Sequence, residues 1–128
     1  MTKYLLDTHV LLWSAENSPL LSAAAKGAVT DKDSEKYVSL VSAWEVTIKL
    51  GTGKLRFTGG LPGFLRMIEE KGFYILTLEQ EYFLQIPSLP DYHKDPFDRM
   101  LIATAIAENM TLVTADENIH KYNVSWVW

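Results

Sequence analysis

The chain has 128 residues, 48% of them hydrophobic and 22% charged, which is the composition of a folded domain and excludes a disordered segment. Its net charge of −4 argues against a protein that holds nucleic acid on a broad basic surface, and the lack of cysteine excludes disulfides and thiolate metal sites. No apolar run approaches the roughly 20 residues that cross a bilayer, and the first residues do not resemble a signal peptide. We therefore expect one cytoplasmic domain over residues 1–128 with no membrane contact.

Short apolar runs alternate with helical patterns along the chain. Helices are predicted over residues 9–15, 22–30, 42–50, 61–71, 79–86, 96–109 and 116–121. Strands are predicted over residues 3–6, 37–41, 73–78, 111–114 and 124–127. This alternation predicts right-handed crossovers and a three-layer α/β/α domain with a mainly parallel central sheet of about five strands.

The helix that begins near residue 96 carries an acid at the head of its apolar face. Asp95 suits the N-cap and Pro96 the first helical position. Leu101, Ile102 and Ala105 then follow Asp98 on one helical face, where a carboxylate is costly unless it is paired, hydrogen-bonded or bound to metal. The alternative is that Asp98 is only a capping acid favoured by the helix dipole.

Four acids are expected at the same edge of the sheet, because they follow the carboxyl ends of strands or head the next helix: Asp7, Glu45, Asp98 and Asp116. Each also fits a capping role; Ser42 with Glu45 matches a capping box, and Thr114 with Glu117 matches another around Asp116. Four acids crowded together would repel one another unless they were protonated or neutralised by a cation. Oxygen ligands without cysteine suit Mg²⁺ or Mn²⁺, which promote phosphoryl chemistry.

A negative net charge does not exclude a phosphate-bearing substrate. If the four acids were committed to metal, the other acidic residues would equal the basic ones in number. A substrate carrying phosphates can therefore reach this edge through bound cations.

Several segments together resemble the PIN-domain nucleases, and most closely the VapC toxins of bacterial toxin–antitoxin pairs. They are Leu5–His9, Ser42–Val46, Lys49–Leu55, Asp95–Ala103 and Leu112–Asp116. The resemblance covers the whole chain, and the ordered set is specific although each piece alone would be weak.

The resemblance implies a metal-dependent endoribonuclease. By similarity, Asp7, Glu45, Asp98 and Asp116 would be both the catalytic residues and the ligands of Mg²⁺ or Mn²⁺, and a metal-activated water would hydrolyse RNA phosphodiesters. Thr114 matches a supporting polar position, and Thr8 is expected to support the site beside it. The implied partners are an RNA substrate, a cognate antitoxin protein and a second copy of the chain in a homodimer.

Four basic residues are candidates for contact with the RNA backbone: Lys49, Lys54, Arg56 and Arg99. Scattered cations are more often a solvated face, and Arg99 can equally pair with a neighbouring acid. The histidines lack the local spacing of a zinc site, and His93 is expected to be a surface loop residue. Residues 10–13, together with the helix over 22–30, are expected to form an apolar partner surface.

Two other kinds of domain fit the sequence less well than the nuclease. A receiver domain needs an acidic pair after the first strand, and a haloacid-dehalogenase-type phosphatase needs a second acid two residues after Asp7, where His9 stands. The more serious alternative is a non-catalytic PIN-like module that only binds RNA or protein. Such a module would not need four acids.

Overall fold

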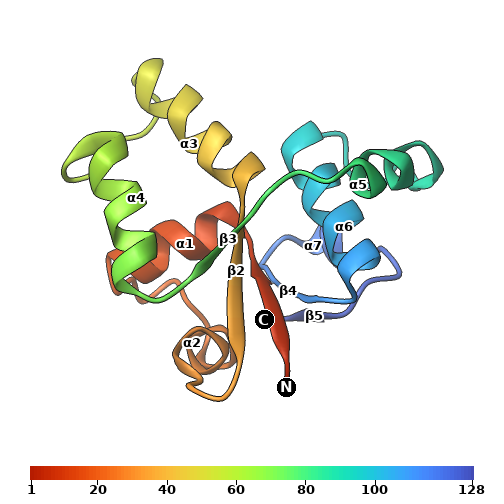
Figure 1. Ribbon diagram of the computed structural model, residues 1–128, viewed down its shortest axis with the longest axis horizontal. Coiled ribbons are helices and arrows are strands. Elements are labelled where there is room, and N and C mark those ends of the chain that lie inside the picture. The colour runs from red at the N-terminus through yellow and green to blue at the C-terminus, as the bar shows by residue number, and fades with distance from the viewer.

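The computed structural model describes all 128 residues, and it places one parallel sheet between two layers of helices (Figure 1). The strand order is β3-β2-β1-β4-β5, and all neighbouring strands are parallel. The strands are β1 (Lys3–Leu6), β2 (Glu35–Ser39), β3 (Tyr74–Leu76), β4 (Thr111–Val113) and β5 (Trp126–Val127). The predicted three-layer α/β/α class with five strands is confirmed.

The helices connect these strands as crossovers. They are α1 (Thr8–Ala15), α2 (Ala23–Thr30), α3 (Leu40–Gly51), α4 (Gly60–Glu70), α5 (Gln80–Gln85), α6 (Pro96–Glu108) and α7 (Glu117–His120), with a 3₁₀ turn η1 over Ile86–Ser88. The longest, α6, has 13 residues, and no helix combines the length and hydrophobicity of a membrane-crossing segment.

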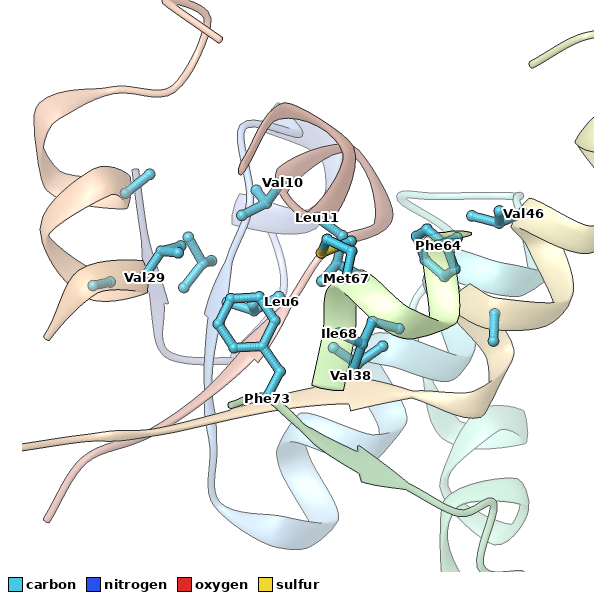
Figure 2. Close-up of a cluster of buried hydrophobic side chains, with 14 residues drawn as sticks. Leu6, Val10, Leu11, Val29, Val38, Val46, Phe64, Met67, Ile68 and Phe73 are labelled. Carbon is cyan, nitrogen blue, oxygen red and sulfur yellow. The ribbon is translucent and has the colours of Figure 1, made fainter. Parts of the chain in front are cut away.

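The sheet buries side chains on both faces because successive residues of a strand point to opposite sides. Leu6 of β1 packs with α1, α2 and α4 in one core cluster, whereas Leu5 packs with α6 in a second. Figure 2 shows the first cluster, in which Phe64 and Ile68 of α4 lie near Val38 of β2. Covering on both faces explains why Leu5 and Leu6 of β1 and Leu112 and Val113 of β4 are all 0% exposed.

The start of α3 differs from the prediction. The helix begins at Leu40, and Ser39 is the N-cap because its hydroxyl accepts from the amide of Val41 at 3.1 Å. The predicted capping box of Ser42 and Glu45 is therefore wrong, and Glu45 lies in the second turn. Residues 35 and 36, expected in a solvated loop, are the first residues of β2.

The helix caps around the other acids are better explained by the sequence. Asp95 caps α6 through the amides of Phe97 and Asp98, as predicted, and Asn109 ends the helix with a left-handed φ of 54°. At α7, Asp116 itself accepts from the amide of Asn118 at 2.8 Å, so the predicted Thr114 box around it is wrong.

The expected apolar partner surface is wrong at Val10 and Leu11, whereas Leu12 and Trp13 are partly exposed. Val10 and Leu11 are 0% exposed and belong to the core between α1 and the sheet. A short apolar run cannot distinguish a core face from a docking face, and here the packing of α1 against α2 and the sheet decides it.

Candidate metal centre

Asp7 directly follows β1 and caps α1, and both of its carboxylate oxygens accept hydrogen bonds. Oδ1 accepts from the amide of His9 at 3.0 Å, and Oδ2 accepts from the hydroxyl of Thr114 at 2.6 Å. The side chain is buried, and burial raises the pKa of Asp7 although these two hydrogen bonds oppose the shift. Asp7 is therefore fixed in orientation at the carboxyl end of the central strand.

Glu45 is held from two sides on α3. The hydroxyl of Thr8 donates to Oε1 at 2.8 Å, and the ammonium of Lys49, one turn further along the helix, lies 2.7 Å from Oε2. This contact with Glu45 raises the pKa of Lys49. The hydroxyl of Ser42 lies 2.9 Å from that of Thr8 and can donate to it, since the single proton of Thr8 goes to the carboxylate.

Asp98 lies in the first turn of α6, where the helix dipole alone would stabilise its charge. Burial nevertheless raises its pKa to about 7, and the negative charges of Asp7 and Asp95 act in the same direction. Glu45 adds a smaller contribution of the same sign. Because the charged form of Asp98 is destabilised in this way, its carboxylate is the one that gains most from a nearby cation.

Asp116 is joined to His93, which the sequence analysis did not place at the site. Nε2 of His93 lies 2.8 Å from Oδ2 of Asp116 and 3.1 Å from Oδ2 of Asp98. Burial would raise the pKa of Asp116, but the hydrogen bonds from His93 and from the amide of Asn118 lower it overall. The expectation that His93 is a surface loop residue is wrong: its side chain is only 13% exposed.

The hydrogen bonding of His93 assigns its proton. Nδ1 accepts from the amide of Asp95 at 3.1 Å, so the proton of the neutral ring is on Nε2, facing the two carboxylates. The three side chains His93, Asp98 and Asp116 are close enough to surround one ion. With its proton on Nε2, however, His93 acts as a donor that holds the acids together, so in this group the carboxylate oxygens of Asp98 and Asp116 are the atoms that could bind a cation.

The carboxylates face an open cavity of 250 Å³, lined by Asp7, His9, Trp13, Asp98, Ala115 and Asp116. Glu45 does not line this cavity, but its charge raises the pKa of both Asp7 and Asp98. The structure thus brings three of the four predicted acids around one cavity and places the fourth beside it. A donor set of carboxylates around a buried, mutually repelling centre fits a hard divalent cation.

The candidate RNA contacts are placed differently from one another. Lys49 is paired with Glu45, whereas Lys54 and Arg56 are exposed in the segment after α3. Arg99 donates to the carbonyls of Ile86, Pro90 and His93, and its side chain is 16% exposed. Its guanidinium holds the loop before α6, so we do not include it among the proposed RNA contacts.

A cavity lined by acids at the carboxyl edge of a five-stranded parallel sheet defines the class of protein: a three-layer α/β domain with a cluster of acidic side chains at the ends of its strands. The family model of the PIN domain matches residues 4–124, and the chain belongs to this family. The resemblance seen in the sequence motifs is confirmed.

Individual relatives agree with this assignment. The chain is 28% identical over 124 residues to Ribonuclease VapC22 of Mycobacterium tuberculosis, covering 95% of this chain and 93% of the relative. The solved structure of VapBC2 from Rickettsia felis, bound to a DNA fragment from its promoter, matches with a TM-score of 0.75 at 16% identity, covering 98% of this chain and 97% of the other. VapBC-1 from nontypeable Haemophilus influenzae matches with a TM-score of 0.70 at 14% identity, covering 98% and 96%. At these identities the two structures are similar in fold.

Proposed function

We propose that this chain is a single-domain, cytoplasmic endoribonuclease that hydrolyses RNA phosphodiesters with Mg²⁺ or Mn²⁺, and that it is the toxin of a toxin–antitoxin pair. The observation that carries the proposal is the set of three aspartates around one cavity, where burial and, to a smaller extent, the acidic neighbours disfavour the charged form of Asp98. Membership of the PIN domain family and the similarity to a ribonuclease support the choice of reaction.

In this proposal Asp7, Asp98 and Asp116 hold the cation, and Glu45 adds negative charge beside them. When bound, the ion supplies a Lewis acid that activates water and stabilises charge on the phosphate. The chain positions its ligands before the ion arrives: Thr114 fixes Asp7, Thr8 fixes Glu45, and His93 keeps Asp98 and Asp116 together. Rigid ligands of this kind reduce the reorganisation that binding and catalysis require.

Lys49, Lys54 and Arg56 are the proposed contacts to the RNA backbone. They lie on and just after α3, which begins at the same edge of the sheet as the acids. Lys54 and Arg56 are exposed and form no ion pair, so they are free to meet phosphates. Contacts of this type position a strand and carry little sequence information.

The proposed protein partners are a cognate antitoxin and a second copy of the chain. The similar structures VapBC2 and VapBC-1 are named as VapBC assemblies. In this chain, apolar side chains are exposed on neighbouring faces of α3 and α4, namely Leu40, Trp44, Ile48 and Leu65, with Trp44 59% exposed. An apolar surface of this kind is typical of one that a protein partner covers.

The test is RNA cleavage by the purified chain with Mg²⁺ or Mn²⁺, compared with EDTA and with Asp98→Asn. We expect both treatments to abolish cleavage, and we expect Glu117→Gln, which removes an exposed acid of α7 outside the cavity, to leave it intact. Cleavage that survives both EDTA and Asp98→Asn would disprove the metal-nuclease mechanism. RNA binding without cleavage in either metal would instead identify a non-catalytic PIN-like module.

A further inference from the structure

A second cavity lies far from the acids in the fold and has the opposite charge. It has a volume of 360 Å³, and its walls come from α1, α2 and the starts of β2 and β3; the lining residues that matter here are Lys26, Lys32, Lys36 and Lys71. No aspartate or glutamate lines it. In a chain with net charge −4, a cavity lined by lysines and by no acid is unexpected and needs an explanation.

The position of this cavity follows from the direction of the elements. Lys36 is the second residue of β2, whereas the acids follow the carboxyl ends of strands, so the lysines lie toward the amino ends. Lys71 is the C-cap of α4, and Lys32 follows the end of α2. In Figure 1, α2 lies beside the beginning of β2, at the end of the sheet opposite to α3.

The lysines are not neutralised by acids. The ion pairs of the structure involve only His9, Lys49, His93 and Arg99. Within the cavity wall, Lys36 donates to the backbone carbonyls of Asp31 and Ser34, which fixes its ammonium group. Several like charges around one concave surface repel one another, and an anion placed among them removes that repulsion.

The rest of the wall suits a nucleotide. Ser14, Asn17 and Thr30 add hydroxyl and amide groups, which bind phosphate and ribose oxygens. Leu21, Val29 and Phe73 add an apolar part, against which a base or sugar can pack. An acidic peptide would use the lysines but would have no comparable use for an apolar wall of this size.

We propose that this lysine cavity binds the phosphate of a nucleotide, either free or as one unit of an RNA strand. Binding of an RNA strand rests on the proposed ribonuclease function, because the strand would then be the substrate, held at a distance from the acidic centre. Binding of a free nucleotide does not depend on that function. The simplest competing explanation is that the lysines only compensate the negative carboxyl ends of α2 and α4.

The test measures binding of AMP, of ADP and of a short single-stranded RNA to the full chain by calorimetry. EDTA is present throughout, so that RNA is not cleaved and the acidic centre holds no cation. The variant is Lys26→Met with Lys71→Met, which keeps the aliphatic stems and leaves Lys36 in place. The matched control is Lys3→Met with Lys121→Met, an equal loss of charge at exposed lysines outside the cavity.

We expect the cavity variant, and not the control, to weaken binding by about tenfold, the effect of losing charged contacts to phosphate. Weaker binding of AMP and ADP would indicate a site for free nucleotides, and weaker binding of RNA alone would indicate a site for a strand. The proposal is wrong if both variants bind like the unmodified chain, or if a polyglutamate peptide binds in place of the nucleotides. Because cleavage plays no part in this test, the chain can fail it and still be a nuclease, or pass it and not be one.

Discussion

His93 and Asp116 are joined by a 2.8 Å contact between Nε2 and Oδ2, and the same nitrogen lies 3.1 Å from Asp98. One imidazole N–H thus links two carboxylates from α6 and from the start of α7. The link is directional, because the amide of Asp95 occupies the other ring nitrogen. It explains how two acids stay close together in the protein itself.

The first prediction follows from this link. His93→Ala removes the donor, so Asp98 and Asp116 are expected to separate, with a loss of about 10- to 100-fold in metal affinity or activity, as for other residues that orient metal ligands. His93→Gln keeps an N–H donor and is expected to restore part of the affinity. Calorimetric titration with Mn²⁺ measures the metal affinity of both variants. Equal affinity in the alanine variant and the unmodified chain would contradict this role.

The second prediction concerns pH and stability without metal. The pKa of Asp98 is raised to about 7 by burial and by neighbouring acids, so the folded state binds a proton more tightly than the unfolded state. The stability of the metal-free protein should therefore fall as pH rises from about 4 to about 7, by at most roughly 4 kcal/mol from this group. Asp7, whose pKa is also raised, acts in the same direction.

Denaturant unfolding in EDTA at several pH values checks this dependence. Asp98→Asn should flatten the curve and make the metal-free protein more stable above neutral pH, although it removes activity. The pKa of Asp116 is lowered, so its effect on stability has the opposite sign. That effect falls below about pH 4, outside the pH range in which Asp98 acts. A stability that rises between pH 4 and 7 would contradict the assignment for Asp98.

The third prediction concerns the hydroxyl that holds Asp7. Thr114→Val leaves a buried carboxylate oxygen without its 2.6 Å donor, which should destabilise the folded protein by about 1.5–3 kcal/mol and raise the pKa of Asp7 further. Thr104→Val is the matched control, because its buried hydroxyl donates only to the carbonyl of Met100 within α6. Denaturant unfolding and metal titration distinguish the two variants. If Thr104→Val weakened metal binding as much as Thr114→Val, the result would argue against the role of Thr114 in holding Asp7.

The fourth prediction concerns Lys49, whose ammonium group lies beside Glu45. Lys49→Met removes a positive charge 2.7 Å from that carboxylate, so the site should bind Mn²⁺ a few-fold more tightly, while RNA binding should weaken. Lys54→Met, which changes an exposed lysine without an ion pair, should affect RNA binding only. Unchanged metal affinity after Lys49→Met would mean that its charge does not act on the centre.

The sequence predicted the sheet and the position of three acids because both follow from local rules. Asp7 and Asp116 directly follow apolar strands, and the cap at Asp95 places Asp98 in the first turn of α6. The start of α3 was misjudged because two serines compete as caps, and the choice of Ser39 depends on where β2 ends. Glu45 still lies beside the cavity, at the same edge of the sheet, although it does not line it.

The contacts that complete the centre could not be predicted in this way. His93 meets Asp116 across 23 residues, and the signal that could have indicated it is only its place two residues before the cap Asp95. Arg99 was a candidate for RNA contact or for pairing with an acid, but the loop before α6 folds back and its carbonyls accept from the guanidinium. The lysine cavity joins residues of α1, α2 and β2 with Lys71 and Phe73 from the connection between α4 and β3, and no spacing along the chain predicts it.

The hydrogen bond between Thr114 and Asp7 spans 107 positions, almost the whole chain. β4, which places Thr114 and Asp116 at the centre, lies between β1 and the final strand β5. A chain still being synthesised therefore has its first acid early but lacks both the hydroxyl that fixes it and the last of the four acids. The first 113 residues alone therefore cannot form the complete acidic centre, and any activity of that centre would have to wait for the segment that supplies Thr114 and Asp116.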